Sequence, residues 1–102
     1  MADKPPERKV QAVPRFPKSK RRLTPAVQTE IDKQVKSLIG NPLAGELKAG
    51  AIRLVRVVKF PAEDRQYLLA YSFFPKKNVI EVLDVGVHEN FYRGLEKYLK
   101  DR

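Results

Sequence analysis

His88 is the only histidine of this chain, and it stands where an acid or a base could act. It follows the apolar run that ends at Val87 and lies four residues before Tyr92. Histidine titrates near neutral pH, so it can take or give a proton during a reaction. A structural role is the alternative, because His88 also precedes Asn90, a residue type that often caps the start of a helix.

Basic residues lie on and around the apolar run that comes first in the second half of the chain. Arg53 and Lys59 fall on one face of that run if it is a strand, and Arg56 falls on the other. Lys48 precedes the run, and Arg65 opens the next one. Arginine and lysine hold phosphate oxygens, so this set predicts contact with phosphate groups. Charged residues are also common on wet sheet faces, which leaves a purely structural alternative.

The composition excludes several kinds of chemistry. The 102 residues include no cysteine, which excludes disulfides, thiol catalysis and thiolate metal sites. With one histidine and no clustered carboxylates, we expect no metal site and no cofactor. No apolar run reaches the roughly 18 residues that a membrane span needs, and the N-terminal stretch lacks the apolar segment of a secretory signal. We therefore expect a cytoplasmic protein without a membrane partner.

The net charge points to an anionic partner. Twenty-one Lys and Arg residues against twelve Asp and Glu residues give +9, a balance that is typical of proteins that bind polyanions. Residues 1–22 carry eight of the basic residues and two of the acidic ones. A nucleic acid and an acidic protein are the two partners that fit, and a solvated basic tail that aids solubility is the alternative.

Residues 1–15 are basic and rich in proline, and we expect them to form a flexible tail. Residues 16–102 are expected to form a single domain. A short edge strand within Val10–Phe16 is the element that could reach into the tail. A short turn of helix around Lys18–Leu23 could precede the first long helix.

The first clear helix begins after Thr24, a good N-cap, with Pro25 in the first helical position. Gly40 and the residues after it end the helix. Its apolar residues recur at helical spacing and predict one stripe that packs on a flat surface. The residues of this stripe are Val27, Ile31, Val35, Leu38 and Ile39.

Three apolar runs follow, at residues 51–60, 65–74 and 79–87. Four-residue turns join them, so they should pair antiparallel. A final helix is expected over Asn90–Lys100. This order predicts an α+β fold: a small antiparallel sheet of three or four strands, an N-terminal helix or helix pair on one face, a partly open opposite face, and a short C-terminal helix.

In this order and spacing, the segments resemble the RelE/ParE superfamily of bacterial type II toxins. The matching segments are SLIGNPLAG at the helix end, ELKAG before the first long strand, QYLLAYSF followed by NVIEVLDVG, and GVHENFYRGLEK near the chain end. The resemblance covers roughly Phe16 to Leu99, and the last segment is the most specific. It implies a toxin that a cognate antitoxin protein holds inactive.

The resemblance leaves the activity open between different functions on one fold. RelE-like members cut messenger RNA in the ribosomal decoding site, whereas ParE-like members inhibit DNA gyrase. A basic RNA-binding module without catalysis is a third alternative. Our prediction is a ribosome-dependent, metal-independent endoribonuclease, with mRNA and the ribosome as partners in place of gyrase.

For a RelE-like nuclease, the resemblance assigns catalytic roles. A basic residue after the glycine that ends the last strand matches His88, and a tyrosine near the chain end matches Tyr92. Basic residues on the first long strand are matched most nearly by Arg53 and Arg56. RelE-like nucleases often carry an arginine on the middle strand, just after an aromatic residue, but this chain has Leu68 there.

Arg65 is the nearest replacement for that arginine, and it completes the expected RNA- or phosphate-binding set with Lys48 and Lys59. In such cleavage the 2′-hydroxyl of the RNA attacks the neighbouring phosphate. A base takes its proton, an acid protonates the leaving oxygen, and cations neutralise the charge that builds on phosphorus. His88 is expected to act as acid or base, and Tyr92 to position the substrate.

Overall fold

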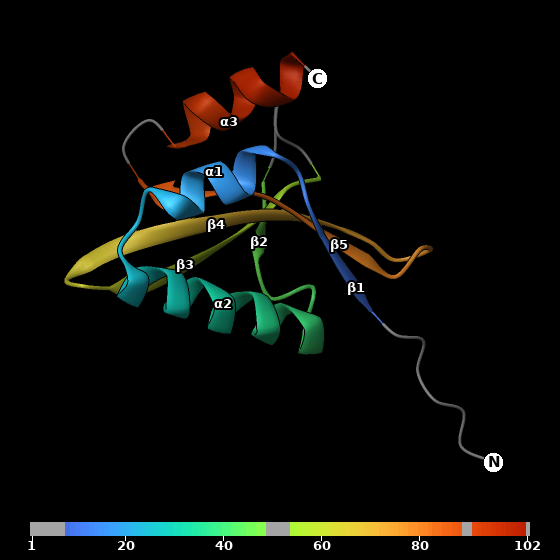
Figure 1. Ribbon diagram of the computed structural model, residues 1–102. Helices are drawn as coiled ribbons and strands as arrows, with labels where there is room; N and C mark the ends of the chain where they lie inside the picture. The colour runs from blue at the N-terminus through green and yellow to red at the C-terminus, as the bar shows by residue number, and fades with distance from the viewer. Residues whose placement is uncertain (1–7, 49–53, 89–90, 102) are drawn as a thin grey trace.

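The structure is a computed structural model that describes residues 8–48, 54–88 and 91–101. Within these residues, three helices pack on one five-stranded sheet (Figure 1). In chain order the elements are β1 (Lys9–Ala12), α1 (Arg15–Arg21), α2 (Pro25–Gly40), β2 (Glu46–Leu47), β3 (Arg56–Ala62), β4 (Arg65–Phe74), β5 (Val79–Val87) and α3 (Phe91–Lys100).

The sheet has the strand order β1-β5-β4-β3-β2. Its centre is the predicted antiparallel meander, in which Phe60 of β3 lies opposite Tyr67 of β4, and Leu69 of β4 lies opposite Val85 of β5. Strand β2 pairs antiparallel with β3, and β1 pairs parallel with β5. The α+β class is therefore confirmed, and the described residues form a sheet of five strands in place of the three or four expected.

Strand β1 lies inside the segment 1–15 that was expected to be a flexible tail. It supplies the expected edge strand, although it begins at Lys9 and ends at Ala12. Arg8 fixes its start: Nε donates to Asn78 Oδ1 at 2.9 Å, and Nη1 donates to the carbonyl of Ile39 at 2.5 Å. Backbone pairing needs no apolar side chains, so the sequence indicates this strand but does not fix its ends.

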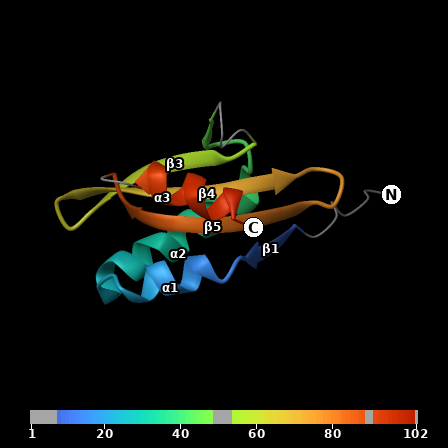
Figure 2. The same ribbon diagram turned by 90° about the horizontal axis from the view of Figure 1, so that it is seen from above.

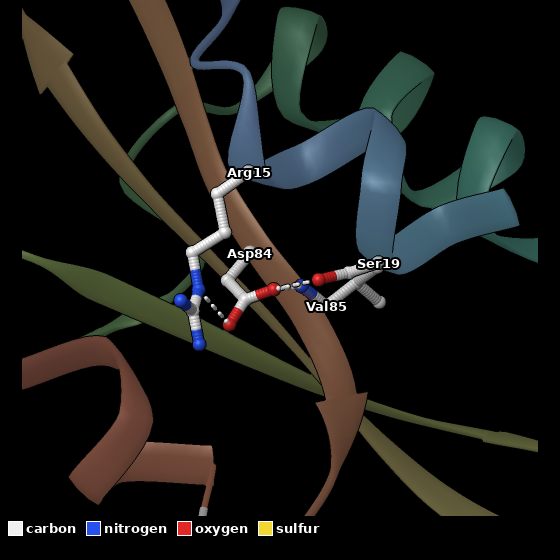
Figure 3. A network of polar contacts seen from close by, with 4 residues as sticks. All are labelled: Arg15, Ser19, Asp84 and Val85. Carbon is white, nitrogen blue, oxygen red and sulfur yellow. Dashed lines mark hydrogen bonds and ion pairs between the residues drawn. The ribbon is translucent and has the colours of Figure 1, made fainter. Parts of the chain in front are cut away.

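Helix α1 begins earlier than the helical turn expected around Lys18–Leu23. It buries Phe16 and is held to β5 by polar contacts (Figure 3). Asp84 of β5 is only 4% exposed, and its carboxylate accepts hydrogen bonds from Arg15 Nε at 2.9 Å and Ser19 Oγ at 2.6 Å. A buried carboxylate is costly without such partners, so these bonds both satisfy Asp84 and fix α1 against the sheet.

Helix α2 starts where predicted, because Thr24 Oγ1 accepts a hydrogen bond from the N–H of Val27 at 3.3 Å. It covers one face of the sheet (Figure 1). The predicted stripe is buried or half-buried except for Ile39, which is 40% exposed near the helix end. The core on this face includes Ile31 of α2 and Tyr71 of β4.

The opposite face of the sheet is covered only in part, as expected, and Lys59, Pro61 and Gln66 stay exposed on it. Helix α3 packs there, on the other side of the sheet from α2 (Figure 1). Its Phe91 and Leu95 are buried in a second cluster with Val57, Leu68 and Leu83. Helical spacing shows that a helix has a buried side, but it does not show which face of a sheet receives that side.

The hairpin between β3 and β4 is tighter than the predicted four-residue turn. Ala62 and Arg65 still pair with each other, so only Glu63 and Asp64 form the turn. Both have positive φ, 47° and 62°, which is the pattern of a type I′ turn and suits the twist of a hairpin. Arg65 is therefore a paired residue of the sheet, directly next to the β3–β4 turn.

Candidate functional site

The end of β5 and the start of α3 bring His88 and Tyr92 together. Their ring centroids lie 5.8 Å apart with the ring planes at 80°, an edge-on contact. Tyr92 makes a second edge-on contact, at 5.5 Å, with the buried Phe91. The core therefore fixes Phe91, Phe91 supports Tyr92, and Tyr92 borders the imidazole of His88.

The imidazole of His88 is exposed, and the helix uses only its backbone. The carbonyl oxygen of His88 accepts a hydrogen bond from the backbone N–H of Phe91 at 3.2 Å. The structural alternative rested on a cap at Asn90, which lies outside the described residues. The contacts that are described leave the His88 ring facing solvent and available to a ligand.

Lys48 reaches the same place from the end of β2. Its Nζ lies 5.3 Å from the centroid of the Tyr92 ring and 2.5 Å from Glu46 Oε1. Its backbone N–H donates to the carbonyl of Val55 at 2.8 Å, which holds this segment beside β3. The bond to Glu46 raises the pKa of Lys48, and Lys48 in turn lowers the pKa of Glu46. Both groups are charged at neutral pH.

Lys59 joins Lys48 across a shallow hollow of about 300 Å³. Lys59 is exposed on β3, and the hollow lies between this strand and the segment around β2. Two lysines thus line one surface, and Glu46, which is bonded to Lys48, lines the same hollow. Such a surface can hold a phosphate group at either lysine.

Arg65 shares a second hollow, of about 240 Å³, with His88. Because Tyr67 pairs with Val87, the start of β4 lies beside the end of β5, and the hollow is formed at that point. Leu68, where RelE-like nucleases often have arginine, is completely buried beneath α3. Arg65 is therefore the arginine of β4 that lines a hollow with His88.

Arg56 is not part of this group. It lies on the other face of β3 from Val57, as the sequence predicts, and its Nη1 donates to the carbonyls of Gly45 at 2.8 Å and Leu43 at 3.3 Å. It is thus engaged in holding the loop between α2 and β2. The fourth residue expected to be catalytic, Arg53, lies outside the described residues.

Tyr71 supports the site from within the core, where the sequence predicts both it and Tyr67. It is completely buried; its Oη donates to the carbonyl of Pro42 at 2.7 Å and accepts the N–H of Gly45 at 2.9 Å. Burial raises the pKa of the Tyr71 hydroxyl. A Cβ on Gly45 would lie 2.8 Å from the Tyr71 ring. Tyr71 thus fixes the loop that leads directly to Glu46 and Lys48.

Glu46 is a site residue that the sequence reasoning missed. The signal was available, since residues two apart on an extended segment project to the same side, and Glu46 and Lys48 are so spaced. A carboxylate beside a lysine weakens that lysine's attraction for phosphate, but it also offers a proton acceptor at the site. The described side chains can therefore combine proton transfer with charge stabilisation.

Metal binding and membrane crossing were considered for the described residues. In residues 8–48, 54–88 and 91–101, no group of three or more His, Asp or Glu side chains is placed to hold a metal ion. Over the same residues, none of the helices has the length and apolar character to cross a membrane.

Three solved structures show the similarity of fold. A mutant of the Escherichia coli toxin RelE in the free state is 20% identical over 92% of this chain and 97% of its own, with a TM-score of 0.73. A chain of the intact E. coli RelBE toxin–antitoxin complex is 22% identical over 80% of this chain and 98% of its own, with a TM-score of 0.67. A chain of the Mycobacterium tuberculosis RelBE2 toxin–antitoxin complex is 14% identical over 80% of this chain and 99% of its own, with a TM-score of 0.71.

At these identities the solved structures establish the fold alone. A search of curated protein sequences found no match. The family model for the ParE-like toxin of type II bacterial toxin–antitoxin systems, in contrast, matches residues 10–96, which is most of the chain. This match confirms the predicted superfamily. The chain belongs to the ParE-like toxins of type II bacterial toxin–antitoxin systems.

Proposed function

We propose that this toxin is a ribosome-dependent, metal-independent endoribonuclease that cleaves mRNA in the cytoplasm and is neutralised by a cognate antitoxin. The observation that supports this proposal most is the series of contacts that links Lys48, Tyr92 and His88, with Arg65 on the far side of the His88 hollow. A histidine with cationic side chains nearby supports RNA cleavage without a metal, because such cleavage needs proton transfer and charge stabilisation.

In this proposal, the scissile phosphate lies in the hollow between His88 and Arg65. Arg65 stabilises the charge that builds on the phosphorus oxygens, and His88 transfers a proton at the attacking or the leaving oxygen. The exposed edge of Tyr92 positions the nucleotide, since aromatic side chains stack on unpaired bases. Lys48 and Lys59 contact the phosphates on the other side of Tyr92.

The partner that neutralises the toxin follows from the family. A type II system pairs a toxin with an antitoxin protein, and two of the similar structures are toxin–antitoxin complexes. The toxin's net charge of +9 favours an antitoxin that carries an acidic segment.

Inhibition of DNA gyrase is the second candidate function. Two observations favour it: the matching family is described as ParE-like, and the middle strand presents the buried Leu68 in place of an arginine. Under this alternative, His88 and Arg65 serve protein binding and cleave nothing. RNA binding without cleavage is the third alternative.

Two assays on one preparation separate these functions. The purified toxin is added to translating ribosomes, and new mRNA 5′ ends are mapped by primer extension; the same protein is tested for inhibition of gyrase supercoiling. We expect cuts within the message that antitoxin abolishes, and no effect on gyrase. Supercoiling inhibition without any mRNA cut would replace the proposal with the gyrase alternative.

A further inference from the structure

Three basic side chains at the C-terminal end of α1 have no part in the site around His88. Lys18, Arg21 and Arg22 are spaced i, i+3 and i+4, so they share one side of the helix, and all three are exposed. The opposite side of α1 contacts the sheet through Phe16 and through the Ser19 bond to Asp84. The helix is therefore anchored on one side and presents three cations on the other.

These cations have no acidic partner among the described residues. Lys20, their neighbour, does have one: its Nζ lies 2.5 Å from Asp32 Oδ1. Arg21 makes only a long bond, 3.4 Å, from Nε to the carbonyl of Pro17 within its own helix. Like charges at this spacing repel each other. Favourable placement near a helix C-terminus explains a single cation, but it does not require three.

The basic end of α1 lies at the same end of the molecule as His88. Thr24, two residues after Arg22, donates from Oγ1 to Glu63 Oε1 at 2.5 Å, in the turn between β3 and β4. Arg65 follows that turn directly and lines the His88 hollow. Seen from above, the end of α1, the β3–β4 turn and the start of α3 all lie at the left of the molecule (Figure 2).

The acidic groups at this end are largely engaged. Asp32 is paired with Lys20, and Glu63 accepts the hydrogen bond from Thr24, while Asp64 is exposed in the turn. Among the described residues, the turn between the α1 cations and Arg65 contributes the acidic pair Glu63 and Asp64. A single-stranded nucleic acid that leaves the His88 hollow toward the β3–β4 turn would reach the end of α1.

We propose that Lys18, Arg21 and Arg22 form a second phosphate-binding surface, which holds the backbone of the RNA strand beyond the nucleotides that contact His88. This inference rests on the proposed ribonuclease function and adds the path that the bound RNA strand takes over the toxin. Cations that contact only phosphates add affinity without sequence preference, and each makes binding more sensitive to salt.

The test compares two double variants that carry the same charge. Arg21→Gln/Arg22→Gln removes two cations from α1, and Lys76→Gln/Lys77→Gln removes two exposed cations from the turn between β4 and β5, so both lower the net charge from +9 to +7. The probe is a short 2′-O-methylated RNA oligonucleotide, which lacks the attacking hydroxyl and stays intact. Its dissociation constant is measured over a range of salt concentrations.

We expect the slope of log affinity against log salt to become shallower by about 1.4 for the α1 variant, because each cation that neutralises a single-strand phosphate contributes roughly 0.7. The turn variant should change by less than half of that. Equal changes in both variants, or an unchanged slope for the α1 variant, would overturn the inference. So would an α1 variant that binds RNA normally but loses affinity for antitoxin, because α1 would then be a protein-binding surface.

This assay does not depend on cleavage. The cleavage assay with wild-type toxin on translating ribosomes tests the proposed function separately. If the wild type cuts mRNA while the α1 variant keeps the wild-type slope of log affinity against log salt, only the inference is refuted. Both variants must also keep the wild-type melting temperature, which checks that the changes act on binding and not on folding.

Discussion

Replacing Tyr71 with phenylalanine removes one oxygen atom from the support of the site. The hydroxyl makes two buried hydrogen bonds, to the carbonyl of Pro42 and from the N–H of Gly45, and both of those residues are buried. Each missing bond costs about 1 kcal/mol, and a buried polar group left without a partner costs about 1–3 kcal/mol. Because some relaxation of the loop recovers part of this, we expect a loss of about 2–3 kcal/mol in the free energy of unfolding.

The assay is urea unfolding followed by circular dichroism, supported by the melting temperature. A loss of that size should lower the melting temperature by roughly 10–20 °C in a domain of about 100 residues. Tyr67→Phe is the matched control: Tyr67 is buried on the same strand and stacks on Phe60, and no hydrogen bond of its hydroxyl is found in the described part of the chain. Tyr67→Phe should lower the free energy of unfolding by less than about 0.5 kcal/mol.

The pH dependence gives a second readout of the same group. Burial raises the pKa of Tyr71 above its ordinary value near 10, so the folded state keeps the phenolic proton at a pH where the unfolded state has lost it. Stability from this group is complete below pH 10 and falls as the pH rises above it. Tyr71→Phe should therefore lose stability less steeply than wild type above about pH 10. If Tyr71→Phe is as stable as Tyr67→Phe at neutral pH, the hydroxyl does not hold the loop.

Two further changes test other parts of the structure. Asp84→Ala removes the hydrogen-bond acceptor for Arg15 and Ser19, and chemical denaturation should show a loss of about 2–3 kcal/mol in the free energy of unfolding. The contribution of charge is discounted in this figure because the Arg15 side chain is 34% exposed. A loss below about 0.5 kcal/mol would show that α1 is held by apolar contacts alone. Arg65→Gln should slow single-turnover cleavage by about 10²-fold, as for loss of one group that stabilises transition-state charge, while antitoxin binding is retained; an unchanged rate would show that Arg65 does not replace the missing middle-strand arginine.

The elements of this fold were predictable where a local pattern determined them. The Thr24 cap and the stripe of α2 follow from spacing, and the meander follows from three apolar runs with short turns. The edge strands were harder to predict, because β2 has two residues and β1 has only exposed side chains, so neither has an apolar pattern. The position of α3 depends on which sheet face was left uncovered, and that is a property of the assembled fold.

The site was predictable to a different degree. His88 and Tyr92 are close in sequence, so their proximity in space follows from the short connection to α3. Arg65 and His88 line one hollow because of the register of β4 and β5, which the sequence does not specify. Arg56 shows the opposite case, since its residue type suggests phosphate binding while its bonds to the carbonyls of Leu43 and Gly45 engage it within the fold.

The proposed role of His88 is to transfer a proton during RNA cleavage, and a comparison of cleavage rates tests this role. The single-turnover rate of mRNA cleavage on ribosomes is measured for wild type, His88→Ala and His88→Gln, with saturating toxin so that binding does not limit the rate. Glutamine keeps a hydrogen-bonding group but cannot carry a proton at neutral pH, so we predict a loss of about 10²–10⁴-fold for both variants, which is the usual size of acid–base catalysis. A loss below about tenfold for His88→Ala, or a His88→Gln variant that cuts at nearly the wild-type rate, would contradict the claim.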